Sequence, residues 1–278
     1  MRDDISVKDR PDKWRWLALC FIVLASFMEL LDVTIVNIAI PTMEHSLHAS
    51  YSAIQWVVTA YGLAFALLLI TGGRLGDIFG RKKMFLFGTV GFTIASLLSG
   101  ISQTGHELIV ARVLQGIMAA LIVPQSLSIV HVTFPKRERA AVFGIFGGVS
   151  GLAALAGPIL GALLIDWNPF GWDWRPIFLV NIPIGIITII GTMIFVHESR
   201  SERPLKVDPI GVLLVTGALL ALVYPLLQGR ELGWPAWTFV SMLASLPIAA
   251  VFILLNGGRL AAVVRRYWRS AFSSDVRL

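Results

Sequence analysis

Two carboxylates lie inside a long apolar segment near the N-terminus. Glu29 and Asp32 interrupt the hydrophobic run of residues 16–40. A charge at the centre of a bilayer costs at least ~2.5–3.5 kcal/mol on insertion scales, so acids in such a run indicate a function. Three residues apart on a helix, the two side chains share a face, which Ala25 and Val36 extend. Burial favours the neutral form of a carboxyl group, and neighbouring carboxyls titrate as a pair. The pair is therefore predicted to exchange a proton and, when ionised, to attract a lipophilic cation.

A third charged side chain, Arg112, lies inside another apolar segment, residues 108–131. An arginine within a membrane span is a functional-site candidate by default. By position it belongs to the same half of the membrane as Asp32 and would bias the proton on that acid. The alternative is that Arg112 extends to the outer interface, where His106 and Glu107 are close in sequence. Both alternatives stay open on the sequence alone.

The composition is that of a protein with many membrane spans. The chain has 278 residues, is 56% hydrophobic and 14% charged, and has a mean hydropathy of +0.77; soluble domains are typically about 25% charged. A span needs roughly 20 mainly apolar residues. Eight segments qualify, and the only cysteine, Cys20, lies in the first of them, where it is interpreted as a small apolar residue. The predicted spans are residues 16–40, 53–72, 84–102, 108–131, 141–165, 176–196, 210–227 and 236–255.

The basic residues predict the orientation of these spans. All of the 23 lysines and arginines except Arg112, Arg175 and Arg230 lie before span 1 or after spans 2, 4, 6 and 8. Basic residues accumulate on the cytoplasmic side, so both termini are predicted to be cytoplasmic. The net charge of +6 is then an orientation signal, and no nucleic-acid partner is expected.

No pattern in the sequence indicates an enzyme. The phosphate-binding, dinucleotide-binding and zinc-protease motifs are missing, and the histidines lie scattered near span ends. We therefore expect no catalytic residues, no cofactor and no metal site. The five histidines are His45, His48, His106, His131 and His197.

The segment after span 2, residues 73–84, reads GRLGDIFGRKKM. Gly73, Gly76 and Gly80 are predicted to form tight turns, and Asp77 to cap a helix N-terminus. Glycines and bases are common in any short cytoplasmic loop, but the order G-x-L-x-D-x-x-G-R-K is more specific. It resembles the signature loop of the major facilitator superfamily, in which the acid and the bases latch the cytoplasmic face. The bases of this loop include Arg81, Lys82 and Lys83.

Two further segments resemble motifs of this superfamily. ARVLQGIMAALIVP, residues 111–124, is similar to its fourth-span motif, in which a buried arginine, here Arg112, is implicated in proton coupling. GIFGGVSGLAALAGPILGA, residues 144–162, is similar to its antiporter motif. Glycines four residues apart allow close helix contact, and a proline is expected to kink the helix. Packing alone explains the glycines equally well, so only the resemblance implies export. The matching residues are Gly144, Gly157, Pro158 and Gly161.

Three stretches narrow the resemblance to the fourteen-span drug:proton antiporters of the QacA/EmrB type. They are LDVTIVNIAIP, WRPIFLVNIPIG and GRELGWPAW, at residues 31–41, 174–185 and 229–237. The resemblance implies that Asp32 is a proton- and substrate-linked acid. Glu29 falls outside the first of these stretches. For Glu29 the alternative to a functional role is that it stays protonated and forms a hydrogen bond to a neighbouring helix.

The expected fold is an all-α membrane protein of the cell (cytoplasmic) membrane, with an N-terminal six-helix bundle of the major facilitator type and two further transmembrane helices. Family members have a second bundle, and this chain resembles only their N-terminal portion. The expected domains are a cytoplasmic leader, the bundle, a linker, the extra helix pair and a basic tail that is truncated, frameshifted or an interfacial helix. Their ranges are 1–15, 16–196, 197–209, 210–255 and 256–278.

The function implied by the resemblance is proton-coupled efflux of lipophilic or cationic drugs. The proton gradient is the expected energy source, and small-molecule drugs, protons and membrane lipids are the expected partners. We expect the chain to insert into the membrane without transporting alone, since substrate binds between two bundles in such transporters. A homodimer or a separate second half would restore transport. The alternative is a non-transporting remnant or a partner subunit.

Overall fold

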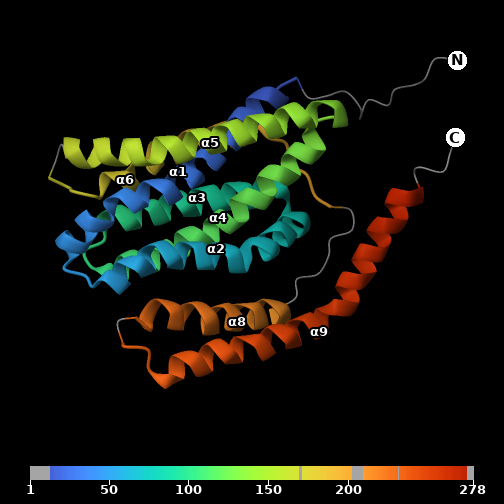
Figure 1. Ribbon diagram of the computed structural model, residues 1–278. Helices are drawn as coiled ribbons and strands as arrows, with labels where there is room; N and C mark the ends of the chain where they lie inside the picture. Colours follow the sequence, from blue (N-terminus) through green and yellow to red (C-terminus); the bar gives the residue numbers. More distant parts are fainter. Residues whose placement is uncertain (1–12, 169–170, 202–208, 231, 274–278) are drawn as a thin grey trace, which may run out of the picture. The chain divides into compact units, whose positions relative to one another are not determined.

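The computed structural model describes residues 13–168, 171–201, 209–230 and 232–273, with side chains described as far as residue 255. Every regular element in this part of the chain is a helix (Figure 1), which confirms the all-α class. The helices are α1 (Arg15–Leu47), α2 (Tyr51–Phe79), α3 (Arg81–Ile101), α4 (Gly105–Thr133), α5 (Lys136–Trp167), α6 (Pro176–Leu179), α7 (Asn181–Phe195), α8 (Pro209–Gln228) and α9 (Ala236–Ser273).

The eight predicted spans are confirmed. Eight helical segments among the described residues are long and apolar enough to cross a membrane, with α6 and α7 together forming the sixth, Pro176–Phe195. Several helices extend beyond the apolar run that predicted them. α1, for example, continues through Pro41 to Leu47, because hydropathy marks only the part of a helix that suits the hydrocarbon core.

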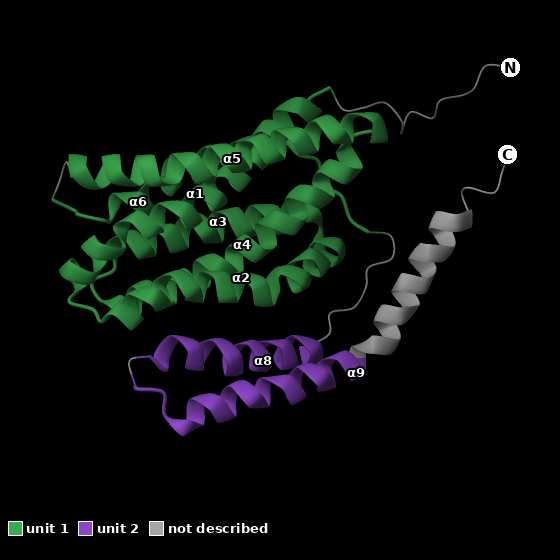
Figure 2. Ribbon diagram, viewed as in Figure 1, with its two compact units in different colours: residues 1–207 green, residues 208–278 purple. Residues whose placement is uncertain are grey.

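The chain forms two compact units, residues 1–207 and 208–278 (Figure 2). In the first unit, α4 packs against α2 and α3, while α1 packs against α5 and α7. In the second unit, α8 packs against α9. Parts of the predicted leader, linker and tail, namely residues 1–12, 202–208 and 274–278, lie outside the described residues.

Close contact between α2 and α4 depends on glycine. A Cβ atom added at Gly116 would collide with the backbone carbonyl oxygen of Tyr61 and would lie 3.1 Å from the Ala64 side chain. A Cβ atom added at Gly72 would lie 2.9 Å from the carbonyl carbon of Ala120. Larger residues at these positions would therefore push the two helices apart. This close approach places Tyr61 of α2 next to Arg112 of α4.

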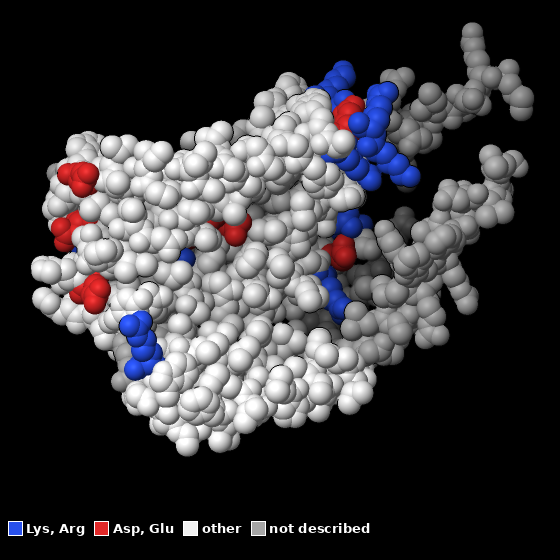
Figure 3. All heavy atoms as spheres, viewed as in Figure 1, with Lys and Arg blue, Asp and Glu red and all other residues white. Residues whose placement is uncertain are grey.

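Most charged side chains visible on the first unit gather at the two ends of its helices, and few lie between those ends (Figure 3). One end collects the basic residues because α1, α3 and α5 begin there and α2 and α4 end there. This distribution fits helices that cross a bilayer, and the cytoplasmic position of the basic end stays a prediction. The basic residues at this end include Arg15, Arg81, Lys82, Lys83, Lys136, Arg137 and Arg139.

Candidate functional site

Asp32 of α1 and Arg112 of α4 form an ion pair inside the first unit. Asp32 is 0% exposed and Arg112 is 1% exposed. The Nη1 atom of Arg112 donates a hydrogen bond to Oδ2 of Asp32, and its Nε atom donates to the backbone carbonyl of Val57 at 3.1 Å. The guanidinium therefore ends on Asp32 in the interior of the unit, and the interpretation that Arg112 extends to the outer interface is wrong.

Two amide side chains complete the surroundings of Asp32. Gln115 Nε2 and Asn181 Nδ2 donate to its Oδ1 atom at 2.9 and 2.8 Å. The same two nitrogens also contact Ser96 Oγ, at 3.1 and 2.9 Å, while Gln115 Oε1 accepts from Arg112 at 2.8 Å. Helices α1, α3, α4 and α7 thus each contribute a side chain to one buried network.

Glu29 lies one helical turn from Asp32 and has a different partner. Its Oε1 atom accepts a hydrogen bond from the hydroxyl of Tyr61 at 3.2 Å. The ring of Tyr61 also packs against the Arg112 guanidinium, whose Cζ lies 4.3 Å from the ring centroid. This is a cation–π contact, and it connects the Glu29 and Asp32 ends of the network. Glu29 is 6% exposed, so unlike Asp32 it keeps a small accessible surface.

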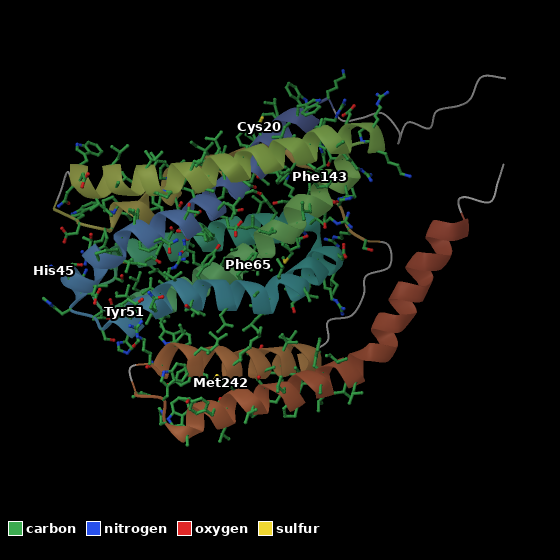
Figure 4. The ribbon with its side chains drawn as sticks, in the orientation of Figure 1. Cys20, His45, Tyr51, Phe65, Phe143 and Met242 are labelled. Atoms are coloured by element: carbon green, nitrogen blue, oxygen red, sulfur yellow. The ribbon has the colours of Figure 1, made fainter. Side chains whose placement is uncertain are left out.

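The network lies well inside the first unit. In Figure 4, His45 and Tyr51 mark one end of this unit, Phe143 lies toward the other, and Phe65 lies between them. The Phe65 ring stacks on that of Tyr61, with centroids 6.4 Å apart. The structure thus places an arginine, two carboxyl groups and several uncharged donors in a buried site. Such a site can hold or release a proton and carries a negative charge when both acids are ionised.

Some members of this network were not expected from the sequence. Gln115 follows Arg112 by three residues, so helical spacing alone would have put both on one face. Asn181 is an isolated amide in a long apolar span, which is also a detectable signal. Ser96 and Tyr61 have no such signal, since serine and tyrosine are ordinary in membrane helices. Asn37, which lies in the LDVTIVNIAIP stretch, does not join the network: it is exposed and donates to the Val33 carbonyl of its own helix at 3.2 Å.

The segment after span 2 differs from the predicted loop. Gly73, Gly76 and Asp77 lie within α2, so neither glycine forms a turn and Asp77 caps no N-terminus. Gly76 instead provides room for the Gln125 side chain of α4, because an added Cβ would collide with it. Only Gly80 breaks the helix, with φ of +113°. Asp77 instead pairs with Arg81 at 2.9 Å.

The acid that caps α3 comes from the far end of span 6. The carboxylate of Glu198 accepts the backbone N–H groups of Lys82 and Lys83 at 3.1 and 3.2 Å. Gly80 leaves room for this carboxylate, because an added Cβ would lie 2.7 Å from it. The Lys82 ammonium donates to the carbonyl of Met193 at 2.8 Å. The predicted loop residues thus fasten α2 and α3 to the end of α7.

The α5 motif divides into two parts. Gly157 and Gly161 are buried against α1, where an added Cβ would collide with Thr34 and with Ile38. Close contact through this glycine pair is confirmed. By contrast, Gly144 has no neighbouring atom within 4 Å of an added Cβ, and the same holds for Gly147, Gly148 and Gly151. Pro158 lies inside the continuous helix α5 and is exposed.

Among the described residues, no group of three or more histidine, cysteine, aspartate or glutamate side chains could hold a metal ion. A proton or an organic cation fits the buried network by charge.

The sequence is similar to several curated transport and resistance proteins. It is 47% identical over 243 residues to the probable actinorhodin transporter of Streptomyces coelicolor, which covers 87% of this chain and 42% of that protein. It is 40% identical to a puromycin resistance protein of Streptomyces alboniger, over 81% of this chain and 44% of that protein. It is 36% identical to the tetracenomycin C resistance and export protein of Streptomyces glaucescens, over 88% and 45%. The chain spans less than half the length of these three relatives.

Solved structures show the same fold. A bacterial homologue of the human lysosomal transporter Spinster, in an inward-facing and occupied conformation, matches with a TM-score of 0.61 and 19% identity. The match covers 90% of this chain and 62% of that one. The peptide transporter POT in complex with sulfate matches with a TM-score of 0.59 over 85% of this chain and 51% of that one, also at 19% identity.

A family model settles the relationship. The model described as Major Facilitator Superfamily matches residues 22–274, which is most of the chain. Together with the eight apolar helices, it confirms a multi-pass protein of the cell membrane and the expectation that the chain is not an enzyme. The chain belongs to the Major Facilitator Superfamily.

Proposed function

We propose that this chain forms the proton-coupling bundle of an exporter for lipophilic or cationic compounds. In this proposal, the network of Glu29, Asp32 and Arg112 links proton binding to substrate binding. The observation that carries the proposal is the complete burial of an ionised pair, Asp32 and Arg112, inside a helical unit of membrane-spanning type.

A buried ion pair needs a reason other than stability. Removing two charges from water costs several kcal/mol per ion, and apolar side chains of similar volume often stabilise a protein as well or better. Charged groups in membrane spans instead mark ion pathways and proton relays. The donors around Asp32 and the ring under Arg112 are arranged to hold charge at this point, which suits a site that responds to a proton.

The relatives support the direction of transport and the kind of cargo. One of them is named as an export protein, and two are named for resistance to an antibiotic. The finer assignment to the fourteen-span, proton-driven subfamily rests on the motifs of the sequence and on the separate α8–α9 unit. A lipophilic cation is the substrate class that fits, since the site is negative when both acids are ionised.

The test is equilibrium binding of a lipophilic cation, tetraphenylphosphonium, to the purified chain in detergent at low and high pH. We expect tighter binding at high pH, where the proton competes less well. Asp32→Asn should weaken binding at least about tenfold, or ~1.4 kcal/mol, because Arg112 would then neutralise Glu29 instead of Asp32.

The matched control is Glu44→Gln, which changes a carboxyl to an amide in the same helix but outside the network. It should bind the cation like the unchanged chain. Binding that is independent of pH and unaffected by Asp32→Asn would show that the network has no part in proton or substrate binding.

A further inference from the structure

We propose that Glu29 is the carboxyl group that gains and loses the proton, and that Asp32 stays ionised as the fixed partner of Arg112. This division rests on the proposed function, and it assigns different roles to two acids that the sequence places on one helix face.

The hydrogen bonds of Asp32 fit a carboxylate. Oδ2 accepts from Arg112, and Oδ1 accepts from both Gln115 and Asn181. All three partners approach through N–H groups, so a proton on either oxygen would face a donor instead of an acceptor. Protonation would also leave the buried Arg112 without its counter-charge, which is the most costly outcome for such a pair.

The surroundings of Glu29 fit both of its protonation states. A tyrosine hydroxyl donates to an ionised carboxylate and accepts from a protonated one, so the Tyr61 contact survives either change with a rotation of the hydroxyl. No lysine, arginine or histidine among the described residues forms an ion pair with Glu29. Glu29 also keeps a small exposed fraction, whereas Asp32 has none.

The other charges around Glu29 are few. Of the helices that pack against α1, neither α6 nor α7 has a titratable side chain, and those of α5 lie in its terminal turns. α2 and α4 contribute Tyr61 and Arg112, and α1 itself contributes Asp32. Since Asp32 and Arg112 cancel each other, the net charge of the site is that of Glu29. It is neutral with the proton bound and negative without it.

The consequence is an exchange at one group. With Glu29 protonated, the site has no net charge to attract a cation. When the proton leaves to water, the ionised Glu29 makes the site attractive to a lipophilic cation. No bond other than the O–H bond of Glu29 breaks in this step.

Infrared difference spectroscopy of the purified chain, stepped between low and high pH, tests the assignment without any drug. A protonated carboxyl group has a C=O stretching band that an ionised one lacks. We expect the Glu29→Gln variant to lose the band of the buried carboxyl. Asp32→Asn should retain it, and the control Glu44→Gln should leave it unchanged. The opposite pattern, in which the band survives Glu29→Gln and disappears in Asp32→Asn, would overturn the assignment.

Tyr61→Phe provides a second readout if a charge variant fails to fold. Removing the hydroxyl takes one hydrogen bond from Glu29, so the frequency of the band should change, and a band that does not move contradicts the assignment. Failure of this inference can be distinguished from failure of the proposed function. A Glu29 band together with no binding of tetraphenylphosphonium contradicts only the function, whereas pH-dependent binding with a band from Asp32 contradicts only this inference.

Discussion

Asp32 and Glu29 have the same chemistry and lie one turn apart on α1, but the helices around them treat them differently. Asp32 meets an arginine and two amides from α4 and α7. Glu29 meets one tyrosine hydroxyl from α2. In the proposed mechanism, the different roles of the two acids follow from their different hydrogen-bond donors, because a low-dielectric interior magnifies each difference in pairing.

The largest effect should follow from removing the positive charge of Arg112, which pairs with Asp32. Arg112→Leu leaves a buried carboxylate unpaired, and breaking a buried pair in this way typically costs ~3–5 kcal/mol. We expect that loss in the free energy of unfolding of the chain, measured by denaturant titration in mixed micelles.

Arg137→Leu is the control for this change, since its side chain is 82% exposed and surface substitutions usually stay within about 0.5 kcal/mol. Equal losses for the two leucine variants would mean that the Asp32 region does not depend on its ion pair.

An intermediate effect should follow from separating α2 and α4. These helices carry Tyr61, the partner of Glu29, and Arg112, the partner of Asp32. Gly116→Ala introduces a Cβ against the Tyr61 backbone, and overpacking of this kind costs ~1–3 kcal/mol. Gly147→Ala is the matched control, because nothing lies within 4 Å of an added Cβ there. Alanine favours a helix over glycine by about 1 kcal/mol, so Gly147→Ala should be neutral or stabilising in a thermal unfolding assay. Identical thermal midpoints would contradict the close α2–α4 contact.

The smallest effect should come from the Glu29 region. Tyr61→Phe removes one hydrogen bond and keeps the ring against Arg112, so the expected loss of unfolding free energy is ~0.5–1.5 kcal/mol. Tyr51→Phe, at an exposed tyrosine, should change little. A loss as large as that of Arg112→Leu would remove the distinction between the two regions.

Much of the fold could be predicted from the sequence, because a bilayer demands long apolar helices and the basic residues alternate between connections. The eight spans followed from these two requirements. The helix ends did not, since α2 continues through Gly73 and Gly76 where isolated glycines suggested turns. Gly76 serves close contact with Gln125 of α4, which hydropathy does not encode.

The site could be predicted only in part. Glu29, Asp32 and Arg112 stood out because charges are rare in apolar spans. That Asp32 and Arg112 meet depends on how α1 and α4 cross, which no local pattern contains. Ser96 and Tyr61 could not be found for the same reason. Glu198, which caps α3 from the end of span 6, is likewise a product of tertiary structure.

The most direct test of the central claim is a pair of double-mutant cycles in the free energy of unfolding, one for Asp32→Asn with Arg112→Gln and one for Glu29→Gln with Tyr61→Phe. Coupling energies of contacting residues range over ~0.5–3 kcal/mol. We predict that the Asp32–Arg112 coupling lies near the upper end and is the same at low and high pH, while the Glu29–Tyr61 coupling lies near the lower end and changes with pH. An Asp32–Arg112 coupling that is the weaker of the two, or that disappears at low pH, would contradict a fixed ion pair beside an exchangeable acid.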